Sequence, residues 1–600
     1  MCGIIARAAG GPVAAELVGA LDTLEYRGYD SAGIAVLGPS GLACEKTAGR
    51  IAELRRRLEA AGYPEGSVGV GHTRWSTHGP PTDANAHPHT DCAGEVAVVH
   101  NGIVENHATL RERLRARGHE FTSDTDSEAV AHLIERHLAE GLDPEAAFRR
   151  AVAAIEGSYA LAAVVEGFDA VLAARSGSPL VLGVGADGHV LASDVPAFLE
   201  LTDDVVYLED GDVAVVRRDG YRLTDRTGSP VERPVETVDW AADDARKGEH
   251  DHFMLKEIHE QPAAIAQATE GRIGEDGAVA LEGFPPGSFD GVSRVHLVGC
   301  GTSFHAALYA ERLLAGHGVP AQAFLASEYT PIAADGDVLV ACITQSGETA
   351  DTLGALRDAG EAGARTLALT NVVGSTAARE ADDALYIRAG PEIGVAATKT
   401  FVSQLATVLL LADRVVRDRG EDALDPGALS ALGGLPGSLE PLTGASAPAS
   451  LARRFHDAEA FFFIGRGLAY PVALEGALKL KEISYRHAEG FAAGELKHGP
   501  LALVTEDTPV FAVFTGADDA RTLSNVSEVQ ARGAPVVGVA PEGGAVENTV
   551  DHLLPVPETH PLVAAIPATV GLQLLSYHVA DLLERPIDKP RNLAKSVTVE

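Results

Sequence analysis

The chain has 600 residues, too many for one hydrophobic core, so three or four domains are expected. An apolar fraction of 46% is typical of a folded globular protein, and five scattered cysteines without a CxxC pair argue against a disulfide framework and against a structural zinc site. The formal charge of −37 argues against a nucleic-acid partner, and it requires any anionic substrate to meet a locally positive site or backbone N–H groups.

The N-terminus offers a candidate nucleophile. Cys2 becomes the first residue once Met1 is removed, and it then carries a thiol and a free α-amine. Their reference pKa values are about 8.5 and about 7.7–8.0, so moving the thiol proton to the amine costs only about 1 kcal/mol. The alternative is an incidental residue on a frayed terminus. The start has no signal-peptide pattern, and no apolar run reaches the roughly 18 residues of a membrane span, which predicts a cytoplasmic protein without a membrane partner.

Residues up to about 220 are predicted to form an α+β domain with antiparallel strands. Helical patterns cover Val13–Leu24 and Asp126–Leu138. Short β-rich runs bounded by turn signals lie at Glu95–His100, Ala160–Val165, Val205–Leu208 and Val213–Val216. This order favours sheets with helices packed over them and not a βαβ array.

Several polar residues of this domain have both a structural and a chemical interpretation. Asn101-Gly102 after a strand is a common hairpin turn, but it also suits an oxyanion hole, with the Asn101 side-chain N–H and the Gly102 backbone N–H as donors. Asp126 is most simply a helix cap or first-turn acid, and its alternative role is to hold an ammonium group. Arg74 suits a forked contact with a carboxylate. The histidines of the loops 72–79 and 85–89 lack the paired spacing of a zinc site, so no metal is expected.

Cys2-Gly3-Ile4, Glu25–Gly33, the two histidine loops and His100-Asn101-Gly102 together resemble the N-terminal-nucleophile glutamine amidotransferases, over about the first 220 residues. The resemblance implies that Cys2 attacks the glutamine side-chain amide and releases ammonia, while Asn101 and Gly102 hold the oxyanion. It also implies that Arg74 and Asp126 grip the glutamine carboxylate and α-amine. The residues expected to line the glutamine site are Arg74, Trp75, Thr77, His78, His87 and Asp126.

The character of the sequence changes after a polar stretch at residues 225–285, which is predicted to be a linker with one amphipathic helix near Phe253–Ile265. Strand, small-residue loop and helix then alternate, which predicts a parallel sheet covered by helices on both faces. The first set is Val295–Val298, Phe304–Leu314, Val338–Ile343 and Thr366–Leu369. A second set follows at Ala460–Ile464, Pro471–Ile483, Val510–Phe514 and Pro535–Val539. We interpret them as two copies of one α/β domain, joined near residues 425–455 by a Gly/Pro/Ser/Ala-rich segment.

The first copy contains a candidate phosphate site. The run Thr344–Thr349 precedes a helix, so it is either an ordinary N-cap or a cradle of hydroxyls, an amide and free backbone N–H groups. Ser303, in the neighbouring loop, is expected to face the same space. No Walker-type P-loop is found, and Gly299 and Gly301 are weak evidence for a dinucleotide because the third glycine of that fingerprint is missing.

The second copy and the C-terminal tail contain candidate catalytic groups. Glu475, Lys479 and Glu482 share one helical face, as an exposed ion pair or as part of a site. His498 lies among glycines, which favours a site over a core position. Lys595 belongs to a tail that is either frayed or a Schiff-base site, and the second role needs burial of the amine, because only on the order of 0.04% of a lysine is neutral at pH 7.

Thr344–Thr352, Glu475–Tyr485, Gly494–Pro500 and the tail extend the resemblance over the whole chain, to the isomerising glutamine:fructose-6-phosphate aminotransferase family. That family implies glutamine and fructose 6-phosphate as substrates, glucosamine 6-phosphate as product, the first step of hexosamine synthesis, no cofactor and a homodimer. It also implies a multidomain α/β fold. The expected parts are an αββα glutaminase domain at residues 2–220, a linker at 221–284, doubly wound SIS (sugar isomerase) domains at 285–424 and 451–590, and a catalytic tail at 591–600.

The family resemblance also implies residue roles. Lys595 forms an imine with the C2 ketone, Glu482 with Lys479 moves the proton between C1 and C2, and His498 helps to open the sugar ring from the partner subunit. Trp75 gates an internal ammonia channel. The sugar phosphate is expected to contact residues Cys300, Gly301, Thr302, Ser303, Thr344, Gln345, Ser346, Thr349 and Val395. Ala397 stands where serine is common in the family, so a side-chain contact from that position is absent.

Two other classes of protein are considered beside this family. An amidotransferase with a phosphoribosyl acceptor is disfavoured by the repeated α/β domain and by the missing P-loop. A phosphosugar-binding regulator needs neither Cys2 nor Lys595, and it commonly carries a helix-turn-helix, which the sequence lacks.

Overall fold

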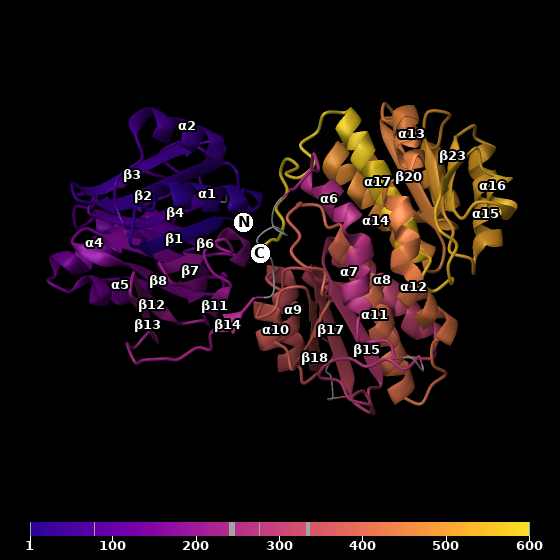
Figure 1. The fold of residues 1–600 in the computed structure, drawn as a ribbon, viewed down its shortest axis with the longest axis horizontal. Coiled ribbons are helices and arrows are strands. Elements are labelled where there is room, and N and C mark those ends of the chain that lie inside the picture. The colour runs from indigo at the N-terminus through magenta and orange to yellow at the C-terminus, as the bar shows by residue number, and fades with distance from the viewer. Residues whose placement is uncertain (1, 77, 239–246, 275–276, 332–336, 599–600) are drawn as a thin grey trace. The chain divides into compact units, whose positions relative to one another are not determined.

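The structure is a computed structural model that describes residues 2–76, 78–238, 247–274, 277–331 and 337–598 (Figure 1). The chain divides into two compact units, residues 1–245 with 596–600, and residues 246–595. Each unit is built around its own sheets. Among the described residues, no helix has the length and apolar character needed to cross a membrane.

Two antiparallel sheets form the centre of the first unit. The eight-stranded sheet has the order β14-β11-β9-β10-β1-β4-β2-β3, and the six-stranded sheet has the order β13-β12-β8-β7-β6-β5. The strands of the larger sheet are β1 (Gly3–Ala9), β2 (Ser31–Gly38), β3 (Gly41–Ala48), β4 (Val68–Arg74), β9 (Val181–Gly185), β10 (Gly188–Ala192), β11 (Asp204–Tyr207) and β14 (Glu236–Thr237). Those of the smaller sheet are β5 (His89–Thr90), β6 (Val96–Gly102), β7 (Tyr159–Val165), β8 (Phe168–Ser176), β12 (Val213–Arg217) and β13 (Gly220–Thr224).

The central strands of this unit, such as β1 and β6, are buried on both faces, which gives four layers. In β1, Ile4 packs into the core between the sheets, whereas Ile5 packs against α1 (Ala14–Leu24) and α2 (Ile51–Ala61). In β6, Val99 faces the other sheet and Val98 faces α4 (Glu128–Ala139) and α5 (Pro144–Val152). Successive side chains of a strand point to opposite faces, so each strand contributes to two cores. The predicted αββα arrangement is confirmed.

The second unit contains two parallel five-stranded sheets with the same strand order. The first sheet runs β16-β15-β17-β18-β19 and the second runs β21-β20-β22-β23-β24, which is the 2-1-3-4-5 order of doubly wound folds in both cases. The first set is β15 (Arg294–Gly299), β16 (Ala321–Leu325), β17 (Val338–Thr344), β18 (Arg365–Thr370) and β19 (Asp383–Tyr386). The second is β20 (Ala460–Gly465), β21 (His487–Ala492), β22 (Val510–Val513), β23 (Val536–Ala540) and β24 (His552–Pro555). The predicted repeat is confirmed by topology.

The helices of the two copies also correspond. They are α8 (Gly301–Gly316), α9 (Ala350–Glu361), α10 (Thr376–Glu380) and α11 (Lys399–Asp418) in the first copy, and α14 (Ala469–Ser484), α15 (Asp519–Gln530), α16 (Gly544–Glu547) and α17 (Ala565–Leu582) in the second. One continuous cluster of buried residues contains Tyr309 of α8, Phe401 of α11 and Phe463 of β20. The two copies therefore share a core.

The two segments predicted to be connectors are more ordered than expected. Residues 425–455 form α12 (Pro426–Thr443) and α13 (Ser446–Phe455), which join the shared core. Leucines at positions 432, 435, 439 and 442 of α12 are buried at helical spacing, so the apolar stripe outweighs the helix-breaking Pro and Gly residues of this segment. The polar stretch after residue 225 contains β14, α6 (Phe253–His259) and α7 (Gln261–Thr269), two helices where one was expected.

Candidate functional site

In the first unit, the thiol of Cys2 lies at the start of β1, beside the end of β4. The backbone N–H of Trp75 donates to Cys2 Sγ at 3.2 Å. The Asn101 side-chain amide and the Arg27 guanidinium both donate to the Cys2 carbonyl, at 2.9 and 3.2 Å. Burial raises the pKa of the Cys2 thiol, against the effects of the chain's amino terminus, the Trp75 N–H and the nearby Arg74 and Arg27 guanidinium groups. The terminus is thus held by hydrogen bonds and not frayed at Cys2.

Asn101-Gly102 does not form a hairpin turn. Both residues belong to β6 and pair with Ala160 and Tyr159 of β7, far along the chain. Gly102 has a φ of +118°, and a Cβ atom there would lie 2.1 Å from the Ser158 carbonyl oxygen, so glycine is required. The hairpin turn, which was the main structural alternative to an oxyanion hole at these two residues, is therefore excluded.

A histidine that the sequence did not single out fixes the orientation of the Asn101 amide. His72 Nε2 lies 3.0 Å from the His100 carbonyl oxygen and 3.1 Å from Asn101 Oδ1. Both partners are acceptors, so Nε2 carries the proton and donates to them. The Asn101 Nδ2 group is thereby turned towards Cys2.

Arg74 and Asp126 offer polar atoms near these groups. Arg74 is buried, its Nη2 donates to the carbonyls of His78 and Gly79, and its Nη1 has no partner among the described residues. Asp126 is not the cap of α4, because Ser127 occupies that position; its Oδ2 accepts the Val104 N–H at 2.7 Å. An unsatisfied buried guanidinium N–H is costly without a partner, which suits a ligand carboxylate.

The remaining residues predicted to contact glutamine lie around this group. Trp75 packs edge-on against Tyr29, with ring centroids 5.6 Å apart. His78 packs edge-on against His107. His87 is buried, stacks on His72 at 4.1 Å and accepts the His100 N–H through Nδ1, so as placed it supports the wall of the site. Thr77 lies outside the described residues.

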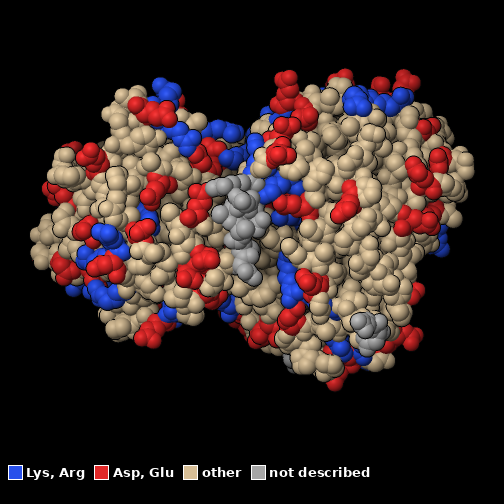
Figure 2. All heavy atoms as spheres, in the orientation of Figure 1, with Lys and Arg blue, Asp and Glu red and all other residues tan. Residues whose placement is uncertain are grey.

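In the second unit, two loops meet where the strand order reverses. The chain passes from β15 outwards to β16 and then returns to β17 on the other side of β15, and ligands of doubly wound folds bind at the carboxyl ends of such a strand pair. Gly299–Ser303 follows β15 and enters α8; Thr344–Thr349 follows β17 and enters α9. The N-termini of both helices, with their free N–H groups, thus border one space. Acidic side chains are scattered over the visible face of this unit (Figure 2). An anion is therefore expected to bind at the locally positive helix N-termini and not elsewhere on this face.

The side chains of these loops leave the helix ends available. Thr349 precedes α9 but makes no capping hydrogen bond with its side chain, so the simple N-cap interpretation is wrong. Ser303 lies in the first turn of α8 and accepts a hydrogen bond from Gln404 Nε2 at 3.0 Å. Gly347 has a φ of +70°, and a Cβ atom there would lie 2.1 Å from Ser375 Oγ. Other contacts of the loops include Thr344 Oγ1 with Gly347 N, Ser346 Oγ with Glu348 N, Cys300 Sγ with Thr352 Oγ1, and the Gln345 carbonyl with Asn371 N.

The polar stripe of α14 is buried at Glu475 and Lys479 and half-buried at Glu482, so it is not an exposed ion pair. Glu475 and Lys479 are each 1% exposed, and Lys479 Nζ lies 2.7 Å from Glu482 Oε2 and 3.4 Å from Glu475 Oε1. Burial alone would lower the pKa of Lys479, but the two carboxylates outweigh it and raise that pKa. Glu475 also accepts from Thr302 Oγ1 at 3.1 Å and contacts His305 Nδ1 at 2.7 Å, which ties α14 to the first turns of α8.

The C-terminal tail is packed at Lys595. Its side chain is 5% exposed, Nζ is ion-paired with the buried Glu392, and it donates to the Gly394 carbonyl at 2.7 Å. Glu257 lies at the same place and accepts the N–H groups of Ile393 and Gly394, at 2.6 and 2.9 Å. Burial, and next the Glu392 charge, raise the pKa of Glu257 to about 8. The frayed-end alternative for Lys595 is wrong.

Two further residues predicted for the sugar site make none of these contacts themselves, although Val395 directly follows Gly394. The backbone N–H of Val395 donates to the Asp588 carbonyl at 3.0 Å. His498 ends a short 3-10 turn, Glu495–His498, and its side chain is exposed. Their roles stay predictions.

Comparison with known proteins finds relatives whose sequences include both groups of residues, the one around Cys2 and the one in the second unit. A SIS domain family matches residues 289–414 and 454–581, and a glutamine amidotransferase domain family matches residues 72–200. Glutamine–fructose-6-phosphate aminotransferases (isomerizing) of Halobacterium salinarum and Thermus thermophilus are 52% and 46% identical to this chain, over 100% of both chains in each case. The C-terminal domain of glucosamine-fructose-6-phosphate aminotransferase from Francisella tularensis, a solved structure, is 36% identical with a TM-score of 0.54 and covers 57% of this chain and 99% of its own.

This chain belongs to the isomerizing glutamine–fructose-6-phosphate aminotransferase family. Four polar residues for which the sequence predicted no role lie around the candidate sites in the structure: His72, Glu257, Glu392 and His305. Their sequence signal is weak, because a single Glu or His in a mixed segment is most often a surface residue. What distinguishes them is burial with a polar partner, which only the fold reveals.

Proposed function

We propose that this chain, as an isomerizing glutamine–fructose-6-phosphate aminotransferase, makes glucosamine 6-phosphate and glutamate from glutamine and fructose 6-phosphate. The observation that carries the proposal is that both ends of the chain are built into polar sites, Cys2 in one unit and Lys595 in the other. Full-length relatives named for this activity support it.

In the glutaminase half-reaction, the Cys2 thiolate attacks the side-chain amide carbon of glutamine. The amide of Asn101 has two N–H bonds, of which one goes to the Cys2 carbonyl, and the other stabilises the oxyanion together with the Gly102 N–H. With Met1 removed, the Cys2 α-amine takes the thiol proton and passes it to the amide nitrogen, which leaves as ammonia. Water then hydrolyses the thioester and releases glutamate. Arg74 Nη1 binds the glutamine carboxylate and Asp126 its α-amine.

In the synthase half-reaction, the helix N-termini around Ser303 and Thr344–Thr349 hold the sugar phosphate. Lys595 attacks the C2 ketone and forms an imine with loss of water, and ammonia then displaces the lysine. Attack needs the neutral amine, so the Lys595 ammonium first passes a proton to its ion-pair partner Glu392 or to solvent. Glu482, held by Lys479 at 2.7 Å, moves the proton between C1 and C2.

Two variants separate the half-reactions. Cys2→Ala should lose glutamine-dependent synthesis, yet keep synthesis from fructose 6-phosphate and high free ammonia, because the sugar site is untouched. Lys595→Ala should lose synthesis from either nitrogen source and keep glutamine hydrolysis. The matched control is Cys44→Ser, an exposed cysteine whose change should alter neither activity. Loss of ammonia-dependent synthesis in folded Cys2→Ala would refute this division.

Chemical trapping tests the imine directly. Borohydride added with fructose 6-phosphate should reduce the imine and attach the sugar to Lys595, detected by peptide mass spectrometry. Lys497→Ala, a change at a lysine that is ion-paired with Glu528 at the surface, should be labelled like the wild type. Labelling that persists in Lys595→Ala would place the imine elsewhere.

A further inference from the structure

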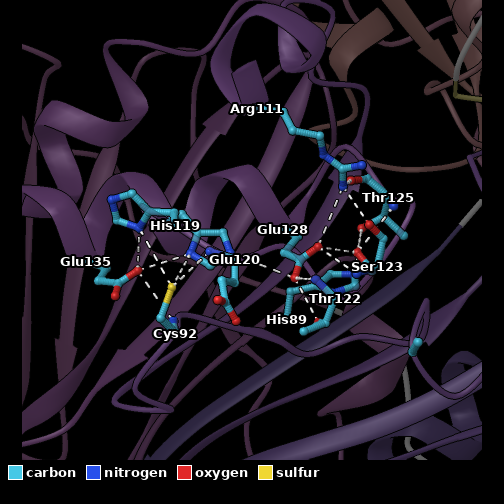
Figure 3. Close-up of polar contacts among 12 residues, drawn as sticks. His89, Cys92, Arg111, His119, Glu120, Thr122, Ser123, Thr125, Glu128 and Glu135 are labelled. Atoms are coloured by element: carbon cyan, nitrogen blue, oxygen red, sulfur yellow. Dashed lines mark hydrogen bonds and ion pairs between the residues drawn. The ribbon is translucent and has the colours of Figure 1, made fainter. Parts of the chain in front are cut away.

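A cluster of metal-binding side chains lies in the first unit, outside the groups assigned to glutamine. Cys92 follows β5, His119 follows α3 (His107–Arg115), and His132 and Glu135 are one turn apart on α4. Their ligand atoms lie within 4.8 Å of one another. In Figure 3, Cys92, His119 and Glu135 point toward a common centre.

The distances within the cluster bring the four ligand atoms near the separations of a tetrahedral metal site. Cys92 Sγ lies 3.6 Å from His132 Nδ1 and 3.9 Å from His119 Nδ1. Glu135 Oε2 lies 3.0 Å from His132 Nδ1 and 2.8 Å from His119 Nδ1. Zinc binds sulfur at about 2.3 Å and nitrogen or oxygen at about 2.0–2.2 Å, so tetrahedral ligand atoms lie roughly 3.3–3.6 Å apart. The two sulfur–nitrogen distances are near this range, whereas the two distances from Glu135 to the imidazoles are shorter and would lengthen by a few tenths of an ångström around an ion.

The surroundings of the cluster resemble those of a bound ligand set. The Glu120 N–H donates to Cys92 Sγ at 3.4 Å, which stabilises a thiolate. His132 Nε2 lies 3.8 Å from the buried carboxylate of Glu128. Metal-bound histidines commonly direct their second ring nitrogen to a carboxylate. Glu128 lies on that side of the ring, at an ion-pair distance that is too long for a hydrogen bond to Nε2. Glu128 is itself held by the Thr122 and Ser123 N–H groups, at 2.7 and 2.9 Å (Figure 3).

Hydrogen bonding alone accounts for only part of this arrangement. Two Nδ1–H groups could both donate to Glu135 Oε2, but the thiol of Cys92 would then face two ring nitrogens that have already used their protons. A cation at the centre satisfies all four atoms at once. Sulfur, imidazole and one carboxylate oxygen are the donor set of Zn²⁺, and they do not suit Mg²⁺ or Ca²⁺.

We propose that Cys92, His119, His132 and Glu135 bind one zinc ion that cross-links the loop before β6, the segment after α3 and helix α4. The Cys92 thiol loses its proton to solvent on binding. The site is independent of the catalytic assignment. It differs from the expectation of no metal, which rested on the spacing of cysteines and of loop histidines along the sequence, because these four ligands come from three separate segments.

The cross-link lies behind the glutamine site. Helix α4 follows Asp126, and β6 ends at Asn101 and Gly102. Ser127, the N-cap of α4, contacts His100 Nδ1 of β6 at 2.8 Å, and Thr125 Oγ1, just before α4, contacts His89 Nε2 of β5 at 2.9 Å, so the start of α4 is joined to β6 and to β5 on the side of the site as well. The role of the ion is therefore structural, to hold these two elements in register.

The test uses the full-length, untagged protein after removal of metal with a chelator. Cobalt(II) titrated into the wild type and into Cys44→Ser should saturate at one ion per chain, with intense tetrahedral d–d bands and a thiolate-to-cobalt charge-transfer band that zinc abolishes. Cys92→Ser should lose the charge-transfer band, and Glu135→Gln should weaken cobalt binding at least tenfold. Zinc should raise the melting temperature of the wild type but not that of Cys92→Ser.

Two results would overturn the proposal. One is cobalt binding to folded Cys92→Ser with the wild-type spectrum and affinity, which would locate the metal elsewhere. The other is absence of a thiolate band at saturating cobalt in the wild type. Because Cys92 is exposed and Glu135→Gln is close in size, both variants should fold, and circular dichroism of each checks this.

Discussion

His72 holds two neighbouring side chains in place around the candidate oxyanion hole. Its Nε2–H fixes the amide of Asn101, and its ring is stacked on His87 in a fully buried position. Burial is the main reason that the pKa of His72 falls to about 3, from about 6.5 in an unfolded chain. The ring is therefore neutral at neutral pH. Its buried Nδ1 then carries no proton, so no donor is left without an acceptor there.

The pKa shift of His72 predicts acid sensitivity. Above about pH 6.5 neither state protonates this ring, so it does not affect stability. As the pH falls from about 6.5 towards 3, the unfolded chain binds the proton and the folded chain does not, so stability falls by about 1.4 kcal/mol per pH unit from this residue. Calorimetric melting between pH 7 and 5 should show a shallower decline in His72→Gln, which keeps an N–H donor without titrating. Equal slopes in both proteins would contradict this account.

Gly347 gives a second prediction for a single residue. Gly347→Ala places a methyl group against Ser375 Oγ at a positive φ, which costs roughly 1–2 kcal/mol and displaces the N–H groups of the predicted phosphate loop. We expect a raised KM for fructose 6-phosphate with glutamine hydrolysis unchanged. The matched control is Gly360→Ala in α9, where the nearest atom to a new Cβ is 3.9 Å away and Ala is favoured. An unchanged KM in Gly347→Ala would argue against a phosphate at this loop.

At the scale of elements, helix α12 shows how packing overrides composition. Its segment is rich in Gly and Pro, including Pro436 and Pro441 inside the helix, and composition alone favours a connector. The leucine stripe buries against the core shared by both sheet copies. The energy of that burial is larger than the penalty of the breaking residues, so the helix forms.

This packing can be tested with one truncation. Leu435→Ala removes a side chain that is 1% exposed, and it should destabilise the second unit by about 2–5 kcal/mol, measured by chemical denaturation. Leu503→Ala, at a position that is 60% exposed, should change stability by less than about 0.5 kcal/mol. Equal effects of the two changes would show that α12 is not part of a core.

For the whole molecule, a mixing experiment can test how many chains make one sugar site. His498 is exposed on its own chain, which fits the prediction that it completes the site of a second copy. If so, His498→Ala and Lys595→Ala proteins, each inactive alone, should regain roughly a quarter of wild-type synthesis when unfolded, mixed and refolded. Half of the dimers are then mixed, and each has one intact site. No recovery in mixed dimers confirmed by mass spectrometry would place His498 and Lys595 of one chain in the same site.

Local pattern was enough for the architecture and for part of the chemistry. Strand–loop–helix alternation predicted both doubly wound copies, since periodicity and turn residues act over neighbouring positions. Cys2, Asn101-Gly102 and Thr344–Thr349 were accessible for the same reason, because each is a contiguous run whose residue types suit one kind of contact.

Only the tertiary structure decided which polar residues are buried and what they meet. From the sequence, Lys479 is equally consistent with a surface lysine, and only the packing of α14 shows that it is buried. The ion-pair partner of Lys595 is Glu392, 203 positions away in the sequence. The four residues of the proposed zinc site likewise come from three segments that no local spacing connects. Charge state and ligand geometry depend on desolvation and on distances across the fold, and a sequence encodes those only through the complete folded chain.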